Sequence, residues 1–394
     1  MKNPSTSFAA VDAAPRDFAA STLLSLVVFA AITPLLLLVA PAVAAQLAVQ
    51  LGLSASQIGT YFFVELGAFS CATLPSLLWL GRVDARRVAA LATAVFCIGN
   101  FATALAMPGF AGLLALRSVT ALGGGTLMVL CMTSAATSAN RDRVYGLWVV
   151  GQLVAGALGL FLLPHVFAGY GLRALYVVLG VLGLCAAPLV RGFDPALGRA
   201  RRTGSTAKAQ ETGTVRAALN ACLVIGGVLA FYVAIGGVWT FASKAAALAG
   251  FDAAHTGEVL AAASVMGIVG AGCASLIGGR VARLAMLLTG YAILAVSLAG
   301  LAAQPGTAGY MAAVFAFKFA WTFVLPFILA AAAKHDGTGR LMASLNFVIG
   351  AGLAAGPLIA GVLLDAGATL PALFAGAAAI SVMSCLCLLR VERA

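Results

Sequence analysis

Residues 18–64 have the sequence FAASTLLSLVVFAAITPLLLLVAPAVAAQLAVQLGLSASQIGTYFFV and contain no charged side chain. A single helix needs only ~20 apolar residues to cross the hydrocarbon core of a bilayer. The uncharged stretch is more than twice that long, so it must cross the membrane, turn and enter it again. We therefore expect a helical hairpin, whose first span is retained because its apolar run is far longer than that of a secretory signal.

The whole chain shares this apolar character. Of its 394 residues, 62% are hydrophobic and 9% are charged, whereas soluble domains are about 45–50% apolar and about 25% charged. Such a chain cannot cover itself with polar surface, so the lipid bilayer is its expected solvent. The eight cysteines lie in apolar runs and the three histidines are scattered at expected helix ends, so we expect no metal site and no cofactor.

Charged residues and turn formers divide the chain into twelve apolar segments, six on each side of a polar stretch. We predict an all-α membrane protein with twelve transmembrane helices in two pseudo-symmetric six-helix bundles. The expected domains are a tail at 1–18, bundles at 19–190 and 217–390, and a linker at 191–216. The segments are 19–48, 56–80, 88–107, 110–137, 145–167 and 173–190, then 217–247, 255–278, 284–303, 307–333, 341–364 and 368–389.

The positive charges lie in short clusters between the apolar segments. Nineteen of the 23 Lys and Arg fall in loops on one side of the expected membrane, and the loops of the other side hold only Arg173. The positive-inside rule therefore predicts an inner-membrane protein with both termini in the cytoplasm. Despite the net charge of +11, no basic face interleaved with aromatic residues is present, so we expect no nucleic-acid partner.

The two halves of the chain carry an internal repeat. An ungapped series of loop residues recurs 198 positions later, and a Pro-Gly pair recurs 197 positions later. Parallel six-helix repeats around a polar linker are typical of secondary transporters, which bind their solute between the halves. The matches are Gly52 with Gly250, Gly59 with Gly257, Gly81 with Gly279, Arg82 with Arg280, Val83 with Val281, and Pro108-Gly109 with Pro305-Gly306.

Three motifs lie at defined places in this pattern. The loop after the second segment is GRVDARR, from Gly81 through Asp84 to Arg86 and Arg87. The fourth segment carries Arg117 followed by three glycines, and the eleventh carries Gly350-x-Gly352-x-x-x-Gly356-Pro357-x-x-x-Gly361. On these residues the chain resembles the major facilitator superfamily over essentially its whole length. The loop is similar to a shortened form of that family's cytoplasmic G-x-x-x-D-R-x-G-R-R signature.

The resemblance implies a transporter that works by alternating access, with the fourth and tenth helices lining a central cavity. The antiporters of the family usually carry a Gly-Pro motif in the fifth helix. Here the run Gly146, Gly151, Gly156, Gly159 lacks the proline of that motif, which weakens an exporter assignment.

Two of the motifs also have a mechanical interpretation. Asp84 beside Arg86 and Arg87 can bridge helix ends when a cytoplasmic gate is shut, although these arginines can equally serve only as topology signals. Gly356 and Pro357 predict a hinge, since glycine permits close helix approach and proline permits a kink.

Three charged residues lie well inside expected spans, away from the span ends, where each charge costs ~2.5–3.5 kcal/mol on insertion scales. Glu65 and Arg117 lie at similar depth from the same side, so we expect them to form an ion pair. Lys318 lies near the middle of the tenth segment, among aromatic residues that include Trp321. We predict that Arg117, Lys318 and these aromatics bind an anionic solute, and that Glu65 with Arg117 carries the coupling proton. A fixed salt bridge, or a Lys318 that snorkels or pairs with Glu65, is the structural alternative.

Four further residues are candidates for solute contact. Gln152 and Asn346 place amides at membrane depth, where they can bind solute or tie helices together. Tyr232 and Trp239 lie two turns apart on one face of the seventh helix, where they can line the cavity or only pack.

The sequence as a whole predicts a monomeric secondary active transporter of a small organic solute, an anion carried by proton symport. A proton-coupled exporter of drugs or metabolites is the alternative within this class, and Glu65 is its only acidic candidate. A membrane-embedded enzyme is the alternative from another class. It would need a nucleophile with a base, or a metal cluster, at one depth, and the scattered histidines supply neither. We therefore predict no enzyme activity.

Overall fold

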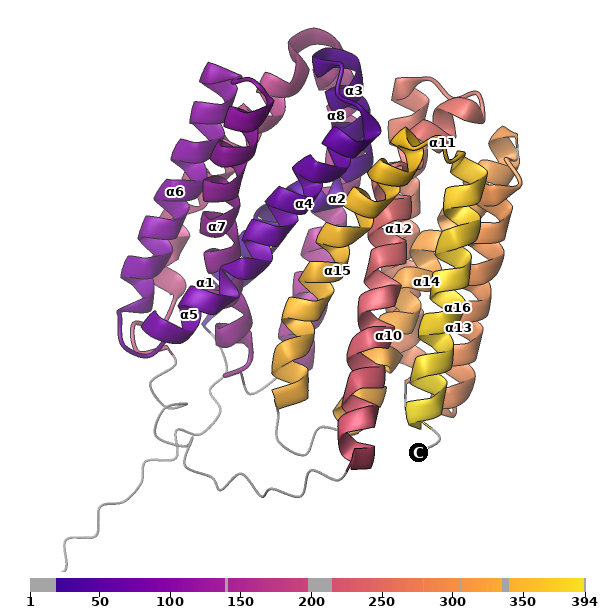
Figure 1. Ribbon diagram of the computed structural model, residues 1–394. Coiled ribbons are helices and arrows are strands. Elements are labelled where there is room, and N and C mark those ends of the chain that lie inside the picture. The colour runs from indigo at the N-terminus through magenta and orange to yellow at the C-terminus, as the bar shows by residue number, and fades with distance from the viewer. Residues whose placement is uncertain are drawn as a thin grey trace, which may run out of the picture.

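The computed structural model describes residues 19–138, 141–197, 215–278, 280–304, 306–334 and 340–392, and the regular elements in these ranges are helices. They form two bundles that lie side by side (Figure 1). The N-terminal half comprises α1 (Ala20–Ile32), α2 (Leu35–Leu38), α3 (Ala40–Leu51), α4 (Ala55–Cys71), α5 (Thr73–Trp79), α6 (Ala85–Ala106), α7 (Phe110–Ala135), α8 (Arg141–Ala186) and the 3₁₀-helix η1 (Ala187–Gly192). The C-terminal half comprises α10 (Val215–Thr240), α11 (Ala242–Leu248), α12 (Ala253–Ile277), α13 (Arg283–Ala302), α14 (Thr307–Lys334), α15 (Arg340–Asp365) and α16 (Leu370–Glu392).

These helices confirm the predicted fold class. Among the described residues, nine helices are long and apolar enough to cross a membrane, and one of them, Arg143–Gly192, is 50 residues long and covers two expected spans. Its two parts meet at Gly171, whose φ of 63° interrupts the helix. The first span is itself divided into α1, α2 and α3, where Pro34 lacks the N–H that an unbroken helix needs.

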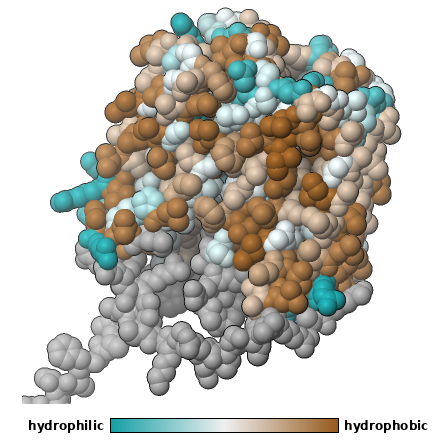
Figure 2. All heavy atoms as spheres, viewed as in Figure 1, coloured by the Kyte–Doolittle hydropathy of each residue, from teal (hydrophilic) through white to brown (hydrophobic). Residues whose placement is uncertain are grey.

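The outer surface of the bundles is apolar. On α6, three large side chains at seven-residue spacing are strongly exposed, with 67% of Leu91, 67% of Ile98 and 81% of Leu105 accessible. Figure 2 shows hydrophobic residues over most of the middle of the visible face. An apolar surface of this extent is suited to lipid contact and would be a liability in water.

The repeat predicted from the sequence recurs in backbone geometry. Gly52 (φ 62°) and Gly250 (φ 95°) adopt the left-handed conformation at equivalent positions. Met107 (φ 35°) and Gln304 (φ 48°), 197 residues apart, are the described non-glycine residues with positive φ. Because such a conformation is uncommon outside glycine, its recurrence at matched positions indicates that the two halves follow the same chain path.

A matched pair of arginines ties each half together. Arg86 Nε on α6 donates to the carbonyl oxygen of Phe193 at 2.8 Å, and Arg283 on α13, 197 residues later, forms an ion pair with Glu392 at 3.3 Å. In both halves the arginine at the start of the third membrane span, α6 or α13, thus binds the end of the sixth span of that half. Asp84 caps α6 by accepting from the N–H of Arg86 at 2.8 Å. In this conformation Asp84 and Arg86 bind within their own half, and the gate role of this loop stays a prediction.

The two halves meet closely at one end of the molecule. We call this end, where α4 and α12 begin, the far side, and the opposite end, where α10 begins and α16 ends, the linker side. Gly59 of α4 packs on the carbonyl oxygen of Pro357 of α15, and Gly257 of α12 packs on that of Leu160 of α8. Leu160 and Pro357 are again 197 residues apart. Neither glycine leaves space for a side chain, so the far side is closed by two pseudo-symmetric contacts.

Pro357 therefore contributes a contact between the halves. The neighbouring Gly356 packs on α10, where an added Cβ would lie 2.7 Å from the nitrogen of Gly237. Hinge motion at these two residues stays a prediction.

Candidate functional site

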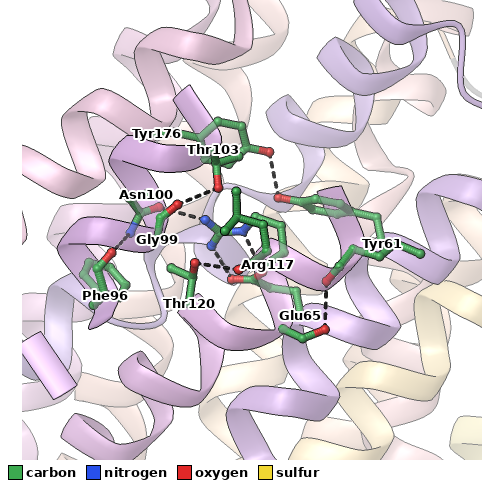
Figure 3. Close-up of polar contacts among 12 residues, drawn as sticks. Tyr61, Glu65, Phe96, Gly99, Asn100, Thr103, Arg117, Thr120 and Tyr176 are labelled. Atoms are coloured by element: carbon green, nitrogen blue, oxygen red, sulfur yellow. Dashed lines mark hydrogen bonds and ion pairs between the residues drawn. The ribbon is translucent and has the colours of Figure 1, made fainter. Parts of the chain in front are cut away.

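The expected ion pair between α4 and α7 is present. Arg117 Nε donates to Glu65 Oε2 at 2.8 Å and Arg117 Nη2 donates to Glu65 Oε1 at 2.6 Å, so the carboxylate is held by both of its oxygens. Both side chains are buried. Figure 3 shows the guanidinium between Glu65 on one side and Asn100 on the other.

Three residues that the sequence analysis did not single out complete this cluster. Arg117 Nη1 donates to Asn100 Oδ1 at 2.8 Å, and the ring of Tyr176 lies 5.1 Å from the guanidinium carbon. The hydroxyls of Tyr61 and Tyr176 share a hydrogen bond of 3.0 Å. The signal available in the sequence was the polar side chain of Asn100 inside the expected span 88–107. In this conformation all three guanidinium nitrogens have acceptors, every one of them within the N-terminal half.

The second cluster surrounds Lys318 on α14, whose side chain is buried with 2% accessible surface. Its Nζ lies 4.0 Å from the ring centroid of Trp239 on α10 and 4.3 Å from that of Trp321, one turn along α14. The two indoles meet edge to face at 6.3 Å. Among the described residues, Lys318 Nζ has no ion-pair partner and no hydrogen-bond acceptor. The alternative in which Lys318 pairs with Glu65 is therefore not adopted in this conformation.

Trp239 adds a second unsatisfied donor to the Lys318 cluster. Its indole Nε1 is buried and has no hydrogen-bond partner among the described residues. Cation–π contacts contribute ~0.5–2 kcal/mol each, which is less than the several kcal/mol that an unpaired charge loses on burial. The cluster is thus electrostatically incomplete without an acceptor.

The remaining candidates have structural partners. Gln152 Nε2 donates to the carbonyl oxygen of Ala30 at 3.0 Å, which ties α8 to α1. Tyr232 is buried against α15, where an added Cβ on Gly352 would lie 2.7 Å from its Cβ. The side chain of Asn346 lies outside the described residues. Solute contact by these three residues stays a prediction.

Comparison with known proteins decides the family. The family model described as "Major Facilitator Superfamily" matches residues 19–340. The chain belongs to the major facilitator superfamily. As a member of it, the protein is a multi-pass membrane transporter that moves a small solute by secondary transport, and not an enzyme. No curated protein sequence matches the transporter.

Solved structures support the fold of the transporter. It is similar to a mutant form of the nucleoside transporter NupG with a TM-score of 0.74, 11% identity, and coverage of 94% of this chain and 99% of that one. It is similar to a D-xylose-proton symporter with a TM-score of 0.73, 14% identity, and coverage of 94% and 95%. A bacterial homolog of the human lysosomal transporter Spinster matches with a TM-score of 0.68, 16% identity, and coverage of 94% and 96%. The TM-scores and coverages support the fold. At identities this low, the solute of a similar protein cannot be transferred to this chain, so the solute has to be inferred from the chain's own residues.

Proposed function

We propose that this transporter carries a small organic anion by proton symport, as a monomer in the cytoplasmic inner membrane with both termini in the cytoplasm. The observation that carries the proposal is Lys318, a buried cation with no counter-ion among the described residues, held between α10 and α14. An anionic solute supplies the missing counter-charge.

The charge balance of the interior favours an anion over a cation. Among the described residues, the buried Asp, Glu, Lys and Arg side chains are Glu65, Arg117 and Lys318. Glu65 neutralises Arg117 through their two hydrogen bonds, so a protonated Lys318 leaves one net positive charge. A cationic drug would be repelled by this charge, whereas a carboxylate would be attracted to it.

Glu65 is our candidate for the proton carrier. Protonation of its carboxyl group would cancel the charge that holds Arg117, and it would free the guanidinium for a solute anion. The close contact between the two side chains supports this role. When Glu65 is ionised, Arg117 is paired with its carboxylate. When Glu65 is protonated, Arg117 lacks a counter-ion and can bind the solute anion. Glu65→Gln should therefore abolish accumulation against a gradient and leave exchange of solute intact. Normal accumulation by this variant would contradict the role.

Uptake by proteoliposomes tests the function directly. The purified transporter is assayed with a panel of small organic anions, organic cations and neutral sugars, with and without an imposed pH gradient. We expect uptake of at least one carboxylate that increases when the outside is more acidic than the inside. Transport of cations alone, in exchange for protons, would instead establish an exporter.

Labelling of the 191–216 segment from each side of intact cells tests the orientation.

A further inference from the structure

We infer that Lys318 and Trp239 form a subsite that binds a carboxylate through two separate oxygen atoms. The inference rests on the proposed function and deepens it, because it assigns the solute's charged group to named donors. Two observations on different helices carry it: the unpaired ammonium of α14 and the unpaired indole N–H of α10.

The two donors are neighbours with different directions. Lys318 Nζ lies 4.0 Å from the centroid of the Trp239 ring, over its face. The N–H of an indole lies in the plane of its ring and points away from the ring centre. An acceptor for this N–H therefore lies beside the ring, while an acceptor for the ammonium lies above it.

This geometry selects the kind of anion. A single atom such as chloride cannot lie beside the ring and above it at the same time, so it can satisfy one donor only. A carboxylate has two acceptor oxygens on one carbon and can bridge two donors. Because a buried donor without an acceptor costs free energy, the bridging anion is favoured over the monatomic one.

The aromatic rings around Lys318 indicate what the rest of the solute molecule is like. Trp321 covers a second side of the ammonium at 4.3 Å, and Phe317 lies 6.1 Å from Trp321 between ring centroids. A carboxylate attached to an apolar or aromatic group fits these surroundings better than a heavily hydroxylated solute, whose hydroxyls would need further partners. The expected class is therefore a monocarboxylate with an apolar or aromatic body.

The subsite lies near the junction of the two halves. An added Cβ at Gly267 of α12 would lie 3.8 Å from the carbonyl oxygen of Lys318 and 3.5 Å from the side chain of Leu153 of α8. This turn of α14 is thus close to the opposite half, as a site used in alternating access must be. The repeat counterpart of Lys318 in the N-terminal half is Ala121, which has no charge. The C-terminal half alone therefore supplies the ammonium of the subsite.

Calorimetric titration of the purified full-length transporter with benzoate tests the inference. We expect saturable binding of benzoate and none of benzamide, its neutral analogue, and we expect chloride not to compete. Trp239→Phe keeps an aromatic ring but removes the N–H, and should weaken benzoate binding roughly 10- to 100-fold, the loss expected for a hydrogen bond to a charged group. Lys318→Met should abolish binding, and Lys318→Arg should retain part of it.

Trp321→Phe is the matched control, because the unpaired indole donor belongs to Trp239. It should bind benzoate more tightly than Trp239→Phe does. Equal affinities for these two variants, equal binding of benzoate and benzamide, or displacement by chloride would overturn the inference. Thermal unfolding of each variant verifies that it is folded.

If carboxylates are transported normally by Trp239→Phe and Lys318→Met, the subsite is wrong and the proposed function stands. If the transporter accepts only cations, the proposed function fails.

Discussion

Asp365 of α15 caps a helix of the opposite half through Ser56 of α4. Its Oδ2 accepts from the N–H of Ser56 at 2.9 Å, and its Oδ1 accepts from the N–H of Ala55 at 3.0 Å. These N–H groups lie in the first turn of α4, where a helix has no internal acceptor for them and carries partial positive charge. The repeat counterpart of Asp365 is Ala168, so only one of the two far-side contacts has this cap.

Asp365→Asn should loosen the far side. An asparagine retains one acceptor oxygen but loses the negative charge and the second acceptor, so the amides of Ala55 and Ser56 become less protected. We expect their hydrogen exchange to accelerate by about tenfold or more, as for the loss of a hydrogen bond to a charged group. Glu258→Gln, at an exposed position near the start of α12, is the matched control. Equal exchange in the two variants would show that Asp365 does not hold the halves together.

Gly361→Ala should prevent the far side from closing. A Cβ at Gly361 would overlap the carbonyl of Ala55 on α4, backbone that cannot move aside without separating the halves. We expect faster exchange at the start of α4 and strongly reduced transport. Gly272→Ala on α12 is the control, since a Cβ there meets no atom within 4 Å, and both changes carry the same gain of ~1 kcal/mol in helix propensity. Normal transport by Gly361→Ala would exclude this contact from the cycle.

Asn100→Leu should destabilise the N-terminal half. The change removes the acceptor of Arg117 Nη1 and leaves a buried charged donor unsatisfied, at a cost of about 1–3 kcal/mol. We expect a lower midpoint of thermal unfolding in detergent. Thr103→Val is the control because, among the described residues, the Thr103 hydroxyl donates only to the carbonyl oxygen of Gly99 within its own helix. A midpoint unchanged by Asn100→Leu would mean that water replaces the amide.

The sequence was sufficient for the fold and for one of the two charged clusters. Hydropathy and the repeat determine the two bundles, and equal depth along adjacent spans was enough to pair Glu65 with Arg117. Depth alone does not give direction around a helix, so the alignment of Asn100 with Arg117 could not be predicted.

Two other contacts, Trp239 with Lys318 and Asp365 with the start of α4, could not be predicted from the sequence, for different reasons. Trp239 and Lys318 meet through packing of α10 on α14, and the repeat offers no charged counterpart from which to infer it. The donors that Asp365 binds are backbone N–H groups, which leave no signature in the side chains.

A double-mutant cycle on Glu65 and Arg117 separates a fixed salt bridge from a proton carrier. Each single change, Glu65→Gln or Arg117→Gln, leaves one buried charge without its partner and should cost about 3–5 kcal/mol. The double variant leaves no buried charge at this site, so its thermal midpoint should recover most of the loss. If the pair only stabilises the bundle, pH-driven uptake into proteoliposomes should recover with it. If Glu65 also carries the proton, as we propose, the double variant should be stable, yet it should not accumulate solute against a gradient. Stability and accumulation recovering together would therefore assign the proton to another residue.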